Sequence, residues 1–191
     1  MTRRDIPNII SILRILLTVP VVVLLLKEQF GVALLLFAIA GASDGLDGFL
    51  AKHYGWESRL GSILDPIADK LLLVSSFLTL GWLGIIPFYL VVVVLARDLA
   101  IFAGALAFHW LIGTYEMVPT VVSKINTFFQ IVLVVAIVFS LSLFGLPGWL
   151  IHSLIYIVLI TSVLSGIDYI WTWGNTAIKE YRKKTGLESH D

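Results

Sequence analysis

The sequence predicts an all-α integral membrane protein, a six-transmembrane-helix bundle with both termini cytoplasmic. The first observation is composition: of 191 residues, 59% are hydrophobic and 14% are charged, and the mean hydropathy of +0.97 is far above that of soluble domains. The second is that apolar runs of about 20 residues, enough to cross a ~30 Å hydrocarbon core, recur along the chain. The third is that the basic residues of the connections fall almost entirely on one side. Without repeats or polar linkers, residues 1-191 are expected to form a single domain.

Six apolar runs account for the predicted spans, and short connections marked by Gly or Pro make consecutive helices neighbours. The spans are about 6–26, 30–50, 63–84, 87–109, 120–144 and 149–173. The first span follows Arg3 and Arg4, which superficially resemble a twin-arginine signal. Asn8 and Arg14 interrupt its apolar run, however, and no small-residue cleavage site follows. We therefore expect a first helix there.

The second and third spans bring acidic residues to the cytoplasmic face. Because the second span runs inward, Asp44 and Asp47 lie near its cytoplasmic end. The third span starts at that face, with Asp65 and Asp69 in its first turns. Pro66 is expected in the first helical turn, where a missing backbone donor costs nothing.

The fourth span contains two charged residues, Arg97 and Asp98, near its middle. They are too deep to reach water, so we expect them to face the bundle interior and to pair. The fifth span follows Pro119 and carries Lys124 near the cytoplasmic side. The sixth is bounded by tryptophans, and all six Trp residues fall near predicted helix ends, as in an interfacial aromatic belt.

Orientation follows from the basic residues, since cytoplasmic loops carry an excess of them. One side holds Arg3, Arg4, Lys52, Arg59, Lys124, Lys179, Arg182, Lys183 and Lys184; the other holds Lys27. Both termini are therefore expected in the cytoplasm, with the chain in the cell inner membrane if its source is bacterial. The basic stretch after the last span favours a membrane-surface anchor over a specific binding patch.

A net charge of zero argues against a nucleic-acid partner, and the lack of cysteine excludes disulfides and thiolate metal sites.

Four aspartates mark the cytoplasmic ends of the second and third spans. Asp44 and Asp47 are three residues apart, and Asp65 and Asp69 are four apart, so each pair lies on one face of a helix. If the two faces meet, the carboxylates repel one another unless cations share the site. Carboxylates without cysteine or paired histidine form a hard-ligand set. We predict a metal site open to the cytoplasm; solvated loop-side charges are the alternative.

The segment from Asp44 to Asp69 resembles the signature of the CDP-alcohol phosphotransferase family, D-x2-D-G-x2-A-R-x8-G-x3-D-x3-D. It departs at Lys52, where the family usually has Arg; a point charge keeps the attraction for a phosphate but loses the bidentate geometry. In length and in its six spans, the resemblance covers nearly the whole chain. It implies transfer of a phosphatidyl group from a CDP-linked lipid to an alcohol, by a homodimer.

The resemblance also implies roles for individual residues. The ligands of two divalent cations, Mg²⁺ or Mn²⁺, would be Asp44, Asp47, Asp65 and Asp69, and Asp69 would also be the catalytic general base. The CDP-lipid would be bound by Asn8, Gly48, Lys52, Gly61 and Arg59. The acceptor would be bound by Arg97, Lys124, Lys70 and Asn126. Structural alternatives stay open: close helix packing for the glycines, a helix cap for Asn8, snorkelling for Arg14 and Lys52, and a structural ion pair for Arg97.

Two departures within the family bear on the acceptor. Phosphatidylglycerophosphate synthases, which use glycerol 3-phosphate, typically carry a second Arg eight residues after the first in the fourth helix and a Gly-Lys-x-Lys-Thr phrase in the fifth. Here Ala105 and Asn126 stand at the second Arg and second Lys positions, so a dianionic phosphate would lose two charge-assisted contacts. The segments 60–62, 65–70, 97–98 and 119–130 look most like those of the eukaryotic-type cardiolipin synthases. This resemblance implies CDP-diacylglycerol and phosphatidylglycerol from the lipid bilayer as substrates, and cardiolipin and CMP as products. Phosphatidylglycerophosphate synthesis is the alternative.

Two other classes compete with this interpretation. Intramembrane carboxylates also mark cation or proton transporters, which would carry polar residues across the whole bilayer and often paired broken helices. Here the outward halves of the predicted spans are almost wholly apolar. An intramembrane aspartyl protease needs two carboxylates that share a proton, not four in this register.

Overall fold

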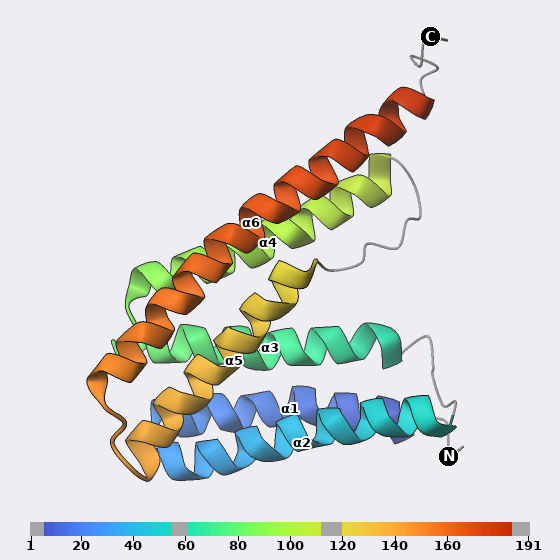
Figure 1. Ribbon diagram of the computed structural model, residues 1–191. Helices are drawn as coiled ribbons and strands as arrows, with labels where there is room; N and C mark the ends of the chain where they lie inside the picture. Colours follow the sequence, from blue (N-terminus) through green and yellow to red (C-terminus); the bar gives the residue numbers. More distant parts are fainter. Residues whose placement is uncertain (1–5, 55–60, 112–119, 185–191) are drawn as a thin grey trace. The chain divides into compact units, whose positions relative to one another are not determined.

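The computed structural model describes residues 6–54, 61–111 and 120–184, with side chains described over 9–45, 64–107 and 120–172 and at Trp110 and Gly174. These residues form six helices (Figure 1). They are α1 (Ile6–Leu26), α2 (Phe30–Tyr54), α3 (Gly61–Trp82), α4 (Phe88–Leu111), α5 (Val121–Ser142) and α6 (Gly148–Lys184). The predicted all-α architecture with six helices is confirmed.

Four helices are long and apolar enough to cross a membrane. The segments are Ile9–Leu26, Phe88–Ala107, Val121–Ser142 and Gly148–Thr172. In α2 the apolar segment Phe30–Gly45 is shorter, and α3 carries Asp65, Asp69 and Lys70 in its first half. Within the described part of the chain, the structure therefore supports four candidate spans where the sequence predicted six.

Helix ends differ from the predicted spans in several places, of which three are informative. α2 continues to Tyr54 and α6 to Lys184, because polar residues that end an apolar run need not end a helix. α3 begins at Gly61, so Pro66 lies inside the helix and not in its first turn as predicted. Its missing N–H therefore removes one intrahelical hydrogen bond.

The chain divides into two compact units, which are described separately. The first comprises residues 1–88 and 131–151, and the second 89–130 and 152–191. In the first unit, α1 lies beside both α2 and α3 (Figure 1). Its core contains the fully buried side chains of Val21, Ala40, Phe77 and Leu80. This packing turns one face of α1 toward two neighbouring helices.

In the second unit, α4 and α6 lie side by side (Figure 1). The Tyr169 hydroxyl on α6 donates a hydrogen bond of 3.0 Å to the carbonyl oxygen of Ile101 on α4. Gly104 lies beneath the same ring: a Cβ there would come within 2.9 Å of the Tyr169 ring. A small residue at this position is what lets the two helices approach so closely.

The distribution of polar and apolar side chains is that of a protein whose surroundings are apolar. Large hydrophobic side chains are exposed on several helices, among them Leu16 (62%), Phe102 (69%) and Ile170 (66%). Polar side chains are instead buried: Ser11, Arg14, Ser76, Arg97, Asn126, Gln130, Ser162 and Ser165. Polar groups in a bilayer must find partners inside the protein, so this arrangement agrees with the candidate spans.

Candidate active site

One face of α1 is polar although the helix is otherwise apolar. Ser11 is completely buried, Arg14 is 1% exposed, and Thr18 is also buried. The Thr18 hydroxyl donates to the carbonyl oxygen of Arg14, one turn earlier. Residues spaced by three and four positions share a helix face, and this face contacts Asp44 of α2 and Asp65 and Asp69 of α3.

Arg14 joins one aspartate from each of these two helices. Its Nη1 atom lies 2.8 Å from Oδ1 of Asp44 on α2 and 2.5 Å from Oδ1 of Asp69 on α3. The guanidinium is buried, whereas the side chains of Asp44 and Asp69 are 46% and 52% exposed. Two carboxylates that are distant in sequence therefore converge on one nitrogen and keep access to the surroundings.

A second contact joins α1 to α3. The Ser11 hydroxyl donates a hydrogen bond to Oδ1 of Asp65. Ser11 precedes Arg14 on α1, and their respective partners, Asp65 and Asp69, come in the same order on α3. These two helices therefore run parallel. This agrees with the expectation that the first and third helices start on the same side of the membrane. We call Asp44, Asp65 and Asp69 the acidic cluster; Ser11 and Arg14 are its partners on α1.

The metal site stays a prediction, although the carboxylates of the acidic cluster are the type of ligand that it requires. Carboxylate oxygens are hard ligands for Mg²⁺ and Mn²⁺, and those of Asp44 and Asp69 already approach a shared cationic atom. Among the described side chains, no three acidic or histidine residues are grouped closely enough to hold a metal ion. The side chain of Asp47, the fourth predicted ligand, lies outside that part of the structure.

The residues expected to bind the CDP-lipid are placed only by their backbone. Asn8 lies in α1, Gly48 and Lys52 lie in α2, and Gly61 is the first residue of α3, but their side-chain environment is outside the described residues. Arg59, between α2 and α3, falls outside them entirely. Their predicted role therefore stays a prediction.

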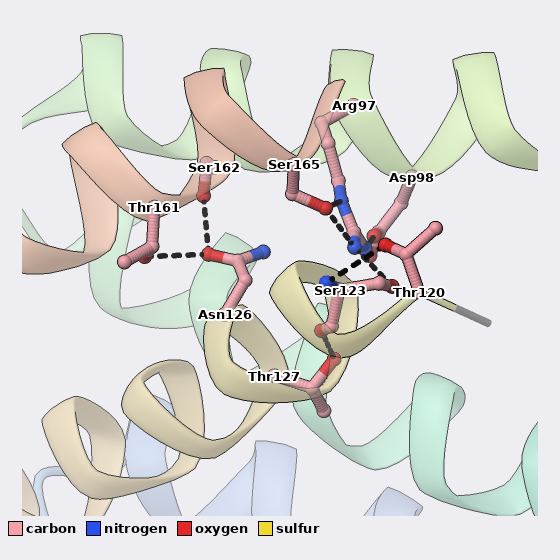
Figure 2. A network of polar contacts seen from close by, with 9 residues as sticks. All are labelled: Arg97, Asp98, Thr120, Ser123, Asn126, Thr127, Thr161, Ser162 and Ser165. Carbon is pink, nitrogen blue, oxygen red and sulfur yellow. Dashed lines mark hydrogen bonds and ion pairs between the residues drawn. The ribbon is translucent and has the colours of Figure 1, made fainter. Parts of the chain in front are cut away.

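In the second unit, Arg97 is the centre of a network of polar contacts (Figure 2). It is 6% exposed. Its Nη1 donates to Oδ1 of Asp98 at 2.7 Å, and its Nε and Nη2 donate to the Ser165 hydroxyl on α6 at 3.0 and 2.6 Å. Nη2 also donates to the Ser123 hydroxyl on α5. The predicted pairing of Arg97 with Asp98 is confirmed, so the alternative of a structural ion pair gains support.

Asn126, further along α5, is completely buried. Its Oδ1 accepts hydrogen bonds of 2.9 Å from the hydroxyls of Thr161 and Ser162 on α6 (Figure 2). Within the described part of the chain, the Asn126 amide nitrogen and both polar atoms of the buried Gln130 side chain have no hydrogen-bond partner. Asn126 therefore joins α5 to α6, whatever else it binds.

The remaining predicted acceptor ligands are the lysines. Lys124 is an exposed residue of α5, and Lys70 is a half-buried residue of α3. Lys70 belongs to the first unit, whereas Lys124, Arg97 and Asn126 belong to the second. Their predicted role in binding the acceptor stays a prediction.

Sequence reasoning placed Arg14 in the first apolar run but did not connect it, or Ser11 one turn earlier, with the aspartates. The snorkelling interpretation of Arg14 is wrong, because its side chain is 1% exposed and paired with two carboxylates. The available signal was the spacing of Ser11 and Arg14 on one face of an apolar helix, where a charged residue needs a partner inside the protein. Which acids it meets depends on how the helices pack.

Comparisons with known proteins identify the family of the chain. Residues 4–171 match the family model described as CDP-alcohol phosphatidyltransferase. "Cardiolipin synthase (CMP-forming)" of Rattus norvegicus is 37% identical over 147 residues, covering 69% of this chain and 49% of the relative; the Homo sapiens protein of that name is 36% identical with the same coverage. The chain therefore spans about half the length of these relatives. A "Probable phosphatidylglycerophosphate synthase" of Mycobacterium tuberculosis is 32% identical over 182 residues, covering 88% of this chain and 82% of the relative.

Proposed function

The chain belongs to the CDP-alcohol phosphatidyltransferase family, and from that premise we propose that it is a cardiolipin synthase. It transfers the phosphatidyl group of CDP-diacylglycerol to phosphatidylglycerol and releases CMP. The observation that carries the reaction class is the convergence of Asp44 and Asp69, the first and last aspartates of the family signature, on Arg14. This convergence supports a single site built from α1, α2 and α3.

The reaction exchanges the phosphoanhydride bond of CDP-diacylglycerol for a phosphodiester bond to the acceptor. A hydroxyl of the acceptor attacks the phosphorus that carries the diacylglycerol, the bond from that phosphorus to CMP breaks, and the hydroxyl proton passes to a base. We assign that base to Asp69, which is half-exposed and can be reached by an acceptor. Asp44, Asp47, Asp65 and Asp69 would hold two divalent cations, Mg²⁺ or Mn²⁺, which supply charge neutralisation for the transferring phosphoryl group and for CMP.

The environment of Arg97 bears on the acceptor. Its charge is balanced by Asp98, and its Nε and Nη2 atoms donate to serine hydroxyls. Ala105 and Asn126 stand where a second arginine and a second lysine would serve glycerol 3-phosphate. Fewer available cations suit a monoanionic diester such as phosphatidylglycerol better than a dianionic monoester. The alternative, phosphatidylglycerophosphate synthesis, is favoured by the relative of that name, which the chain matches over most of both lengths.

We further propose that all six helices span the bilayer, with both termini and the active site at the cytoplasmic face, and that the enzyme is a homodimer. The parallel direction of α1 and α3 and the one-sided distribution of Lys and Arg support the orientation. The CDP-lipid would meet Asn8, Gly48, Lys52, Gly61 and Arg59 there. The homodimer rests on the family resemblance.

The test is an acceptor assay with the purified protein, CDP-diacylglycerol and Mg²⁺ or Mn²⁺. We expect cardiolipin and CMP when phosphatidylglycerol is added, and loss of both products with a chelator. Phosphatidylglycerophosphate formed from glycerol 3-phosphate, without cardiolipin from phosphatidylglycerol, would reverse the choice of acceptor. Ion flux in liposomes without any lipid product would favour a transporter instead.

A further inference from the structure

Arg14 lies where the acidic cluster needs positive charge. Its guanidinium is 1% exposed, and a single atom, Nη1, meets both Asp44 and Asp69. Neither acid is on its own helix, because α1 contains no aspartate or glutamate. The pairing therefore depends on α2 and α3 being packed against α1.

From this geometry we propose that Arg14 is the internal counter-cation of the acidic cluster, a positioning residue that a divalent cation must displace from Asp44 or Asp69 in order to bind. The inference rests on the proposed metal site. In the metal-free protein, Arg14 holds the two carboxylates together. In the metal-bound protein, its charge opposes the incoming cation and so sets how tightly that cation is held.

The balance of charge supports this role. One guanidinium facing two carboxylates leaves a net negative charge, so the cluster still attracts cations. A divalent ion at the same carboxylates would, however, sit close to a buried positive charge, and like charges at short range repel strongly where water is scarce. Ser11 bonds Asp65 with a neutral hydroxyl, so that contact orients a carboxylate without cancelling its charge.

Arg97 offers a matched control inside the same chain. It is also a buried arginine, but its partners are Asp98 and two serine hydroxyls in the second unit. Replacing it removes a buried guanidinium with similar loss of packing, and no change at the acidic cluster is expected. A difference between the two substitutions in metal binding would therefore report on the acids and not on burial.

The experiment measures Mn²⁺ binding and thermal unfolding of the full chain in detergent. Free Mn²⁺ is followed by its electron paramagnetic resonance signal, and unfolding by tryptophan fluorescence, for the wild type, Arg14→Gln, Arg14→Lys and Arg97→Gln. We expect Arg14→Gln to lower the metal-free Tm and to bind Mn²⁺ about tenfold more tightly, because a repelling charge is gone. Arg14→Lys should stay near the wild-type affinity, and Arg97→Gln should lower Tm without changing the affinity.

Unchanged or weaker Mn²⁺ binding by Arg14→Gln overturns the proposal, as does a wild type that binds no Mn²⁺. Should Arg14→Gln fail to fold, the double variant Arg14→Gln/Asp44→Asn decides. Removing one carboxylate together with the guanidinium should restore folding if the two are paired; a double variant that also fails to fold contradicts the pairing. None of these measurements needs catalysis. If the tighter binding is found but no acceptor yields product, the inference stands and the proposed function fails.

Discussion

Two buried arginines, one in each unit, show how partners decide what a buried charge can do. Arg14 meets two half-exposed carboxylates from other helices, whereas Arg97 meets the neighbouring Asp98 and two serine hydroxyls. Around Arg97 the charges cancel and most guanidinium donors are occupied, which favours a fixed structural role. Around Arg14 negative charge is in excess and accessible, which favours exchange with cations and substrate.

The largest effect should come from Asp69, one of the two half-exposed carboxylates that meet Arg14. Asp69→Asn removes both the proposed base and an anionic ligand, so we expect turnover to fall about 10³-fold while the protein still folds. The measurement is cardiolipin and CMP formation by the purified variant, with its Tm as the check on folding. Asp168→Asn, a change on α6 to which no role is assigned, is the control. Near-normal turnover of Asp69→Asn would remove Asp69 from the mechanism.

The corresponding change beside Arg97, at its partner Asp98, should lower the stability of the fold. Asp98→Asn leaves the buried Arg97 without its ionised partner, and breaking a buried ion pair costs about 3–5 kcal/mol. We expect a clear fall in Tm, with the apparent affinity for CDP-diacylglycerol little changed in the protein that remains folded. Should Asp98→Asn instead leave Tm intact and abolish use of the acceptor, Arg97 belongs to substrate binding and the contrast between the two arginines is lost.

The smallest effect should come from Ser11, whose hydroxyl donates to Asp65 of the acidic cluster. Ser11→Ala removes the hydroxyl that orients Asp65, a loss of about 1 kcal/mol for a single hydrogen bond. We expect the Mn²⁺ concentration for half-maximal turnover to rise a few-fold, with a modest decrease in Tm. The matched control is Ser76→Ala: Ser76 is equally buried in α3, but its hydroxyl donates to the carbonyl of Leu72 in its own helix and, among the described residues, to no aspartate. Equal metal dependence in the two variants would show that Ser11 does not position Asp65.

Much of the fold was readable from the chain because helical spans are local features. Their length and apolar composition predicted six helices close to their observed positions. The helix ends were less accurate, as Pro66 shows: α3 starts at Gly61, before the apolar run. Pairing of Arg97 with Asp98 was also predictable, because adjacent charges deep in an apolar helix have few other partners.

The sequence by itself determined the six helices, the family signature and the spacing that puts each aspartate pair on one helix face. These depend on hydrophobic length and helical period, which are properties of short segments. Only the tertiary structure decided that Asp44 and Asp69 share Arg14, that Ser11 holds Asp65, and that Ser165 completes the surroundings of Arg97. These contacts join different helices, so they depend on the rotation of each helix about its axis and on the packing of its neighbours, which no single segment encodes.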